Sequence, residues 1–304
     1  MKTLIILFSL LISLICQANG GSNFMESDIF KSMKQGDKAA LLIVHFGTTY
    51  DDTRKLTIEA INTKITKAFS GVTVREAYTS RIVINRLKQR EIVKQTPTEA
   101  LLALKEDGYT HILIQSTNII EGIEMEALRR EVENMESSFK DIRVGNPLLY
   151  TVEDYEKVVS ILGKQYSGKG TVVLVGHGTY TPATATYSML EYMLKDKGYK
   201  QMYVGTIEGY PSFSSMLRLL KSSKEKQVTL VPFMFVAGDH ANNDIAANWK
   251  EMLEKEGFNV TVSLQGLGEN PDIQNLFTDH AHFISTHKMI KIMDKKKRYA
   301  NEEN

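Results

Sequence analysis

The sequence predicts an α/β protein made of two similar Rossmann-like domains, whose parallel sheets face one another across a cleft. Three observations predict this class. Continuous apolar runs alternate with amphipathic helical stretches, which is typical of parallel strands covered by helices on both faces. The same alternation occurs twice along the chain. Similar short sequences also open both copies, LLIVHFGT at residues 41–48 and VLVGHGT at residues 173–179.

The first copy occupies residues 37–150. Residues 39–46 form an apolar run (AALLIVHF) that is followed by Gly47, as expected of a strand that leads into a turn. Apolar residues at helical spacing then predict a helix over residues 52–69, and Gly71 is a residue type that commonly follows a helix end. Three further elements are expected in the order strand, helix, strand, over residues 72–77, 98–106 and 111–115.

The second copy occupies residues 151–304, and each of its first three strands is followed by a short segment that contains glycine. The expected strands cover residues 171–175, 202–205, 228–236 and 260–264. The expected helices cover residues 188–195, 214–221 and 245–256. With 304 residues, 42% of them hydrophobic, each copy has enough chain to bury a core of its own, so we expect two domains.

The N-terminal residues have the pattern of an export signal. Lys2 is followed by an apolar run over residues 4–15 and then by a short stretch of small and polar residues. The run is shorter than the roughly 20 residues that span a bilayer. We therefore expect a signal peptide over residues 1–18 and a linker over residues 19–36, which predicts a protein exported to the periplasm or the outer membrane.

Cys16, the only cysteine, lies where this apolar run ends, and two outcomes fit its position. Cleavage after Ala18 would remove it, whereas a lipoprotein signal ending before Cys16 would make it the lipidated first residue. Ile15 is bulkier than the residue usually found before a lipidated cysteine, which counts against the second outcome. In both cases the mature chain has no disulfide and no cysteine ligand or nucleophile.

Several function classes are not indicated. The formal net charge of +1 gives no general attraction to nucleic acid. No phosphate-binding loop or Gly-x-Gly-x-x-Gly follows a predicted strand, so we expect no nucleotide cofactor. His280, His282 and His287 resemble a metal cluster, but on a helix only His280 and His287 would share a face, so we interpret them as residues of a helix with surface and core positions.

Three polar residues follow successive predicted strands of the second copy: His177, Glu208 and His240. Ligands bind at the carboxyl ends of parallel strands, and two imidazoles with one carboxylate suit a divalent ion such as Co²⁺ or Fe²⁺. One histidine at a strand end is more often a turn residue, so their joint position carries the prediction. Asp239 and Asp244 flank His240, where each is expected either to orient its ring or to cap the following helix.

Several segments of the chain resemble the anaerobic sirohydrochlorin cobaltochelatases, which are ATP-independent chelatases. These segments are VHFGTTYDDTR (44–54), TSRIVINRLKQR (79–90), VGHGT (175–179), EGYP (208–211), VAGDHANND (236–244) and GLGENP (266–271). The resemblance covers about residues 39–283. It implies two chelatase-like domains with a tetrapyrrole between them, and a divalent metal, Co²⁺ or Fe²⁺, as substrate. It places the metal-site residues of the family on His177, Glu208 and His240, with Gly178 and Tyr210 in the matching motifs expected near the tetrapyrrole.

The chain departs from this family pattern at two positions of the first copy. His45 stands where relatives usually have serine, and Asn118 stands where they commonly have histidine. Both follow predicted strands on the wall opposite His177, so we expect both to contact the macrocycle. The exchange is expected either to move an axial contact to the macrocycle onto His45 or to relax a requirement of the biosynthetic enzyme. Glu121, Glu124 and Glu126 follow, and they are expected either to guide a cation or to lie on a solvated helix.

Export leaves the macrocycle and the reaction direction open, because cobalamin biosynthesis is a cytoplasmic pathway. The resemblance implies cobalt insertion into sirohydrochlorin. An exported member would instead meet haem, which implies a haem-binding protein or dechelatase that works with outer-membrane haem or tetrapyrrole uptake proteins. A carrier that binds without turnover is the third alternative, and the sequence leaves a homo-oligomer open.

Overall fold

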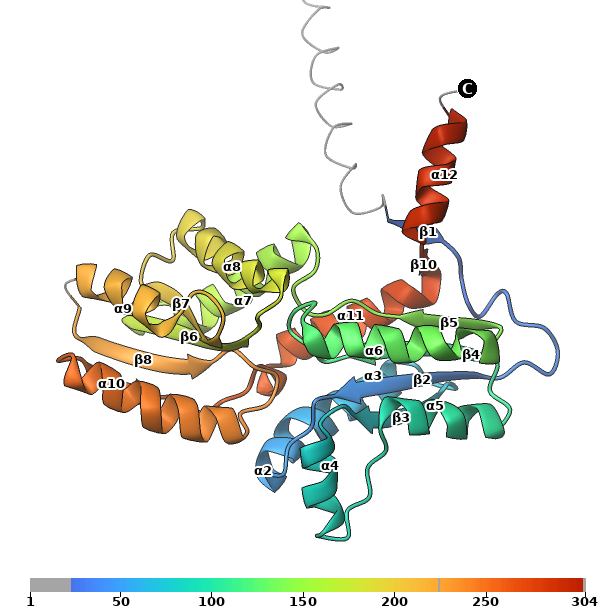
Figure 1. Cartoon of the computed structure of the whole chain (residues 1–304), viewed down its shortest axis with the longest axis horizontal. Coiled ribbons are helices and arrows are strands. Elements are labelled where there is room, and N and C mark those ends of the chain that lie inside the picture. The colour runs from blue at the N-terminus through green and yellow to red at the C-terminus, as the bar shows by residue number, and fades with distance from the viewer. Residues whose placement is uncertain (1–22, 224, 303–304) are drawn as a thin grey trace, which may run out of the picture.

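The computed structural model describes residues 23–223 and 225–302 (Figure 1). It contains two four-stranded parallel sheets, with the strand orders β3-β2-β4-β5 and β7-β6-β8-β9. The two orders are equivalent when the strands of each half are counted in sequence. The predicted α/β class, with two parallel sheets in duplicated topology, is therefore confirmed. The predicted signal peptide and Cys16 lie outside the described residues.

The first sheet is formed by four strands of the first half. Its strands are β2 (Ala39–His45), β3 (Thr73–Tyr78), β4 (His111–Ser116) and β5 (Asp141–Val144). The helices around it are α2 (Asp51–Arg54), the π-helical η1 (Lys55–Glu59), α3 (Ala60–Ala68), α4 (Arg81–Lys88), α5 (Pro97–Glu106), α6 (Ile123–Met135) and the short η2 (Glu136–Ser138). Residues on both faces of β2 and β4 are buried, which explains why their sequences are apolar without alternation.

The second sheet repeats this plan. Its strands are β6 (Thr171–Gly178), β7 (Met202–Glu208), β8 (Gln227–Pro232) and β9 (Asn259–Val262). The helices around it are α7 (Val152–Tyr166), η3 (Pro182–Thr184), α8 (Ala185–Asp196), α9 (Phe213–Ser222), the π-helical η4 (Ala241–Trp249), α10 (Lys250–Lys255) and η5 (Leu267–Glu269).

The third strand of this sheet ends earlier than the sequence predicts. The apolar run continues to Val236, but β8 ends at Pro232. Beyond it, the carbonyls of Met234 and Phe235 accept hydrogen bonds from the segment around Leu267 rather than from a neighbouring strand. The apolar residues after Pro232, of which Phe233 and Phe235 are buried, line the cavity rather than continue the sheet.

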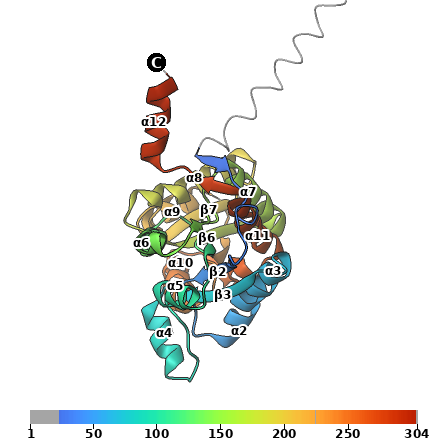
Figure 2. The ribbon, with the colours of Figure 1, turned by 90° about the vertical axis from the view of Figure 1, so that its right-hand side faces the viewer.

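The C-terminal part of the chain returns to the first domain. Helix α11 (Pro271–Thr286) packs against β4 and α3. The predicted second copy, residues 151–304, therefore contributes a helix to the first domain. Helix α11 is followed by β10 (His287–Met289), which pairs with β1 (Phe24–Glu26), and by α12 (Ile292–Glu302), which projects from the body (Figure 2). Part of the predicted linker is thus structured, because Phe24 packs against Phe283 of α11.

The three C-terminal histidines are separate residues rather than a cluster. His280 bonds to Asp154, His282 stacks on Phe69, and His287 begins β10 instead of continuing the helix. No helix of residues 23–223 and 225–302 is long and apolar enough to cross a membrane.

A buried contact between Asp154 and His280 joins α7 to α11, and we expect Asp154→Ala to lower the free energy of unfolding by about 3 kcal/mol. Asp154 Oδ1 lies 2.8 Å from His280 Nε2, and its other oxygen accepts from the Thr151 amide at the start of α7. Burial raises the pKa of Asp154, but the hydrogen bond and charge of His280 outweigh it and hold the pKa below its ordinary value.

The depressed pKa fixes the direction of the pH dependence. The stabilisation should be fully present above the ordinary pKa of 3.8 and should disappear as the pH falls through the lower folded-state value. Urea unfolding at pH 7 and in the acid range measures this, with Asp154→Asn as the variant that keeps the shape of the side chain. A gap between wild type and Asp154→Ala that is independent of pH would contradict the role of the charge.

Candidate active site

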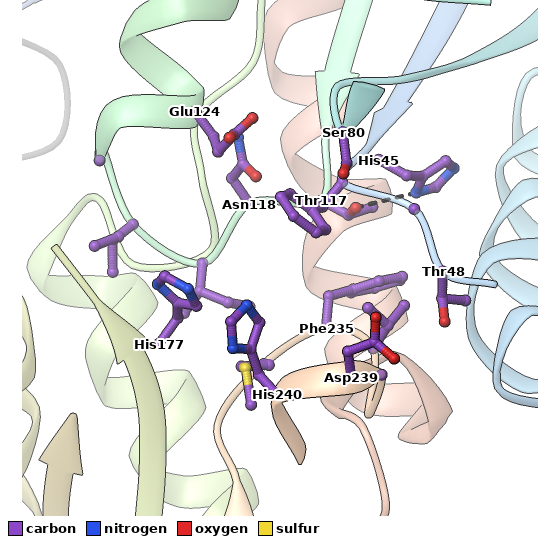
Figure 3. Close-up of a pocket in the computed structure, with 18 of the residues that line it drawn as sticks. His45, Thr48, Ser80, Thr117, Asn118, Glu124, His177, Phe235, Asp239 and His240 are labelled. Atoms are coloured by element: carbon purple, nitrogen blue, oxygen red, sulfur yellow. Dashed lines mark hydrogen bonds between the residues drawn. The ribbon is translucent and has the colours of Figure 1, made fainter. Parts of the chain in front are cut away.

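The carboxyl ends of the two sheets meet around a cavity of about 380 Å³ (Figure 3). It is lined by segments that follow β2, β3 and β4 in the first domain and β6, β7 and β8 in the second. Parallel sheets place their ligands at this edge, and the volume is within the range of about 300–1,000 Å³ that small-molecule sites have. The predicted site residues that line it are His45, Asn118, His177, Gly178, Glu208 and His240. Tyr210 does not line it and is exposed at the surface.

His177 and His240 follow different strands but lie next to each other in the cavity (Figure 3). Their ring centroids are 4.5 Å apart and the rings are nearly perpendicular. Nδ1 of His177 donates to the carbonyl of Gly178 at 3.2 Å, and Nδ1 of His240 donates to Asp244 Oδ2 at 2.8 Å. With Nδ1 protonated in each ring, Nε2 keeps its lone pair, which is the form that binds a metal.

Glu208 lines the same cavity, and its strand end approaches that of His177 closely. It ends β7 and is in register with Gly178 at the end of β6. A Cβ at position 178 would lie 1.7 Å from the carbonyl oxygen of Glu208, so only glycine permits this approach. His177 and Glu208 therefore line the cavity from neighbouring strands.

The structure does not arrange His177, Glu208 and His240 as the three-ligand metal site that the sequence predicted. Within the described parts of the chain, no group of three or more His, Cys, Asp or Glu side chains is arranged to hold a metal ion. The histidine pair and the carboxylate instead border an open cavity. The structure brings the two histidines together, and Glu208 lines the same cavity.

The carboxylate of Asp244 holds the ring of His240, and we expect Asp244→Ala to slow metal transfer about 10- to 100-fold, as loss of such outer-sphere partners usually does. Asp244 lies in the first turn of η4, four residues after His240. The initial rate of metal insertion into a tetrapyrrole measures the effect. Asn243→Ala, at the exposed neighbouring position, is the matched control. Equal rates for the two variants would show that Asp244 does not orient the ring.

His45 is buried in the wall of the first domain, and both its ring nitrogens are engaged within the protein. Nδ1 lies 3.0 Å from the hydroxyl of Thr117, and Nε2 lies 2.9 Å from Oδ1 of Asn62. The Asn62 amide donates to Glu76 at 2.8 Å, so its oxygen faces His45 and accepts from Nε2. Burial lowers the pKa of His45 to about 4, although the charge of Glu76 and the Asn62 hydrogen bond oppose this shift.

These contacts correct the expectation that His45 offers an axial ligand to a bound ring. The imidazole is neutral at pH 7, and neither nitrogen has a lone pair left for a metal. His45 lines the cavity, and its ring stacks against that of Phe235 with the centroids 6.1 Å apart.

Asn118 and Glu124 line the same wall of the first domain (Figure 3). Glu124 lies in the first turn of α6. Of the other two glutamates in this segment, Glu121 pairs with Arg129, and Glu126 is exposed outside the cavity lining. Only Glu124 is therefore placed to meet a ligand.

Most of the remaining lining is apolar. These side chains are Phe46, Ile82, Val83, Ile119, Ile120, Ile123, Phe233, Met234, Phe235 and Val236. They come from both domains, and Phe46, Ile82 and Ile123 are exposed. Apolar walls with a few polar groups at one side are typical of a site for a flat hydrophobic ligand.

Polar contacts join the two domains at the rim of the cavity. Arg86 of α4 pairs with Asp239 at 2.7 Å, and Tyr50 also hydrogen-bonds this carboxylate. Asp239 is therefore tied to the first domain. Of the two aspartates that flank His240, only Asp244 orients its ring.

A match to a known protein family covers most of the chain. A family model described as cobalt chelatase (CbiK) matches residues 39–286. The chain belongs to the cobalt chelatase family.

Two curated relatives of this chelatase are similar over most of their length. The sirohydrochlorin cobaltochelatase of Salmonella typhimurium is 36% identical over 253 residues, which are 81% of this chain and 96% of the relative. The sirohydrochlorin cobaltochelatase CbiKC of Nitratidesulfovibrio vulgaris is 30% identical over 80% of this chain and 89% of the relative. Among solved structures, SirB from Bacillus subtilis with Fe³⁺ shares the fold with a TM-score of 0.59 at 17% identity, over 82% of this chain and 96% of SirB.

The cavity of the chelatase contains residues that the sequence analysis missed. Ser80 follows β3, and Thr117 follows β4. In the second domain, candidate residues were the polar residues that follow predicted strands, and the same criterion selects Ser80 and Thr117 in the first domain. Phe235 was placed in a strand instead. Within an apolar run, nothing in the sequence distinguishes a residue that lines a cavity from a residue of a buried strand.

Proposed function

We propose that this chelatase transfers a divalent metal ion between its cavity and a tetrapyrrole bound there, without ATP. The observation that carries the proposal is the pair His177 and His240, whose rings lie 4.5 Å apart with Nε2 available on each. The apolar walls beside them would hold the flat macrocycle. Cobaltochelatase relatives that align along most of the chain support the reaction class.

The residues of the second domain supply the proton chemistry that this reaction needs. Insertion of one divalent ion releases two protons from pyrrole N–H groups, and removal of the ion consumes two. Imidazole exchanges protons near neutral pH, and Glu208 adds a carboxylate to the lining of the same cavity. In this proposal the histidines hold the ion through Nε2 and accept the displaced protons with Glu208 as the ion enters the ring.

Anaerobic incubation with sirohydrochlorin and Co²⁺ tests the proposal. The purified protein should produce the absorbance spectrum of the metallated ring faster than the uncatalysed reaction, with no ATP present. The double variant His177→Ala/His240→Ala is the control for unspecific metal binding. A wild-type rate equal to the uncatalysed rate would refute chelatase activity towards this ring.

The second candidate is iron removal from haem. It is favoured by the apolar run at residues 4–15, which predicts export away from cytoplasmic cobalamin synthesis. Incubation with haem and an Fe²⁺ chelator should then yield the fluorescent metal-free porphyrin. Haem binding without any product would instead favour a carrier.

The remaining parts of the proposal concern location and partners. A protein exported to the periplasm or outer membrane, lipid-anchored if Cys16 is retained, would receive its ring from outer-membrane haem or tetrapyrrole uptake proteins. Metabolic labelling with a fatty-acid analogue, compared between wild type and Cys16→Ser, tests the anchor. Cell fractionation tests the location.

A further inference from the structure

Carboxylate side chains line the cavity, whereas no lysine or arginine of the described residues does. The three carboxylates belong to Glu124, Glu208 and Asp239. Glu124 lies on the first-domain wall, and Glu208 lies on the second-domain side with the histidines. A ligand between the domains would therefore have a carboxylate on each side.

Five cations on the surrounding elements are already paired with carboxylates of the protein. These pairs are Arg54 with Asp51 and Glu59, Arg86 with Asp239, Arg90 with Asp51, Lys94 with Glu76, and Arg129 with Glu121. To bind a ligand carboxylate, such a cation would have to break its ion pair, and the protein carboxylate would then remain unpaired near the cavity. The local charge balance would then become more negative.

We propose that this cavity selects tetrapyrroles with few carboxylate side chains, and that Glu124 is a specificity-determining residue. The inference rests on the proposed function, since it concerns the ring held in the same cavity. A ring of the uroporphyrin type, such as sirohydrochlorin, carries eight carboxylates around its edge. A ring of the protoporphyrin type, such as haem, carries only two and presents apolar groups elsewhere.

Charge and shape both favour the second type. Like charges placed together across an interface without a counterion oppose binding. The exposed apolar side chains of Ile82 and Ile123 at the cavity would meet apolar ring substituents without cost, whereas they offer no partner to a carboxylate. Two carboxylates can point to solvent from one edge of a ring, but eight cannot all do so.

The test is a series of metal-free porphyrins that differ in carboxylate number. Binding of mesoporphyrin (two carboxylates), coproporphyrin (four) and uroporphyrin (eight) is followed by the change in porphyrin fluorescence. Affinity should fall along the series, with uroporphyrin bound on the order of 100-fold more weakly than mesoporphyrin. Because salt screens repulsion, the affinity for uroporphyrin should rise with ionic strength, while that for mesoporphyrin should change little.

Variants on α6 test the assigned residue. Glu124→Gln should narrow the gap between uroporphyrin and mesoporphyrin by roughly three- to tenfold, and Ile123→Lys, which adds a cation at the rim, should narrow it further. Glu126→Gln is the matched control, since it removes the same charge from an exposed position of the same helix outside the cavity lining. It should leave the gap unchanged.

The outcomes separate this inference from the proposed function. Uroporphyrin bound as tightly as mesoporphyrin, or more tightly, would overturn the inference and leave the chelatase proposal intact. An equal effect of Glu124→Gln and Glu126→Gln would overturn the role of Glu124. Absence of binding for every porphyrin, and for sirohydrochlorin itself, would refute the proposed function.

Discussion

Replacing His177 or His240 by alanine should lower the rate of metal transfer by about 100-fold or more, because in the proposed function either change removes one of two adjacent imidazoles that hold the ion and accept the protons displaced from the ring. Their ring centroids are 4.5 Å apart, so the two imidazoles are adjacent in the cavity. The measurement is the initial rate of Co²⁺ insertion at saturating macrocycle. Porphyrin affinity is measured in parallel.

The two readouts distinguish a metal-handling role from a structural one. Affinity for a metal-free porphyrin should change little, since the apolar walls remain in place. His282→Ala is the control, because this exposed histidine stacks on Phe69 away from the cavity. If the histidine variants lost porphyrin affinity in proportion to rate, binding of the ring rather than handling of the metal would be their function.

The position of these histidines could be predicted because one physical rule connects sequence to space. Buried parallel strands appear as continuous apolar runs, and parallel strands of one sheet end at the same edge. His177 and Glu208 end neighbouring strands, so finding their strand ends was enough to place them together. His240 was found in spite of an error in its strand, because the chain returns to the same edge after leaving β8 at Pro232.

Other features depend on packing between elements that are distant in sequence. The environment of His45 is set by Asn62 of α3 and Glu76 of β3, and nothing in the sequence indicates that Asn62 accepts from a ring nitrogen while its amide donates to Glu76. The return of α11 to the first sheet was likewise missed, since an amphipathic helix does not specify which sheet it will cover. The pairing of Arg86 with Asp239 joins two domains, and local patterns contain no information about it.

The strand ends that carry His177 and Glu208 can be separated by a single added carbon. We expect Gly178→Ala to lower the free energy of unfolding by about 3 kcal/mol, of which roughly 1–2 kcal/mol is the strain of a positive φ and the remainder is overlap with neighbouring atoms. Gly178 has a φ of +88°, and its added Cβ would lie 1.7 Å from the backbone oxygen of Glu208 and 2.9 Å from Cβ of Thr206. Relieving this overlap would require β6 and β7 to move apart at this end of the sheet.

Gly198→Ala separates the two contributions. Gly198 also has a positive φ, of +90°, but no atom lies within 4 Å of its added Cβ, so this variant shows the strain alone. Urea unfolding of both variants gives the cost of overlap as the difference, and the rate of metal transfer should fall only in Gly178→Ala, because only there does His177 move relative to Glu208. Equal destabilisation by the two variants would mean that β6 and β7 tolerate a wider separation. The close approach at Gly178 would then not be what positions Glu208 relative to His177 at the cavity.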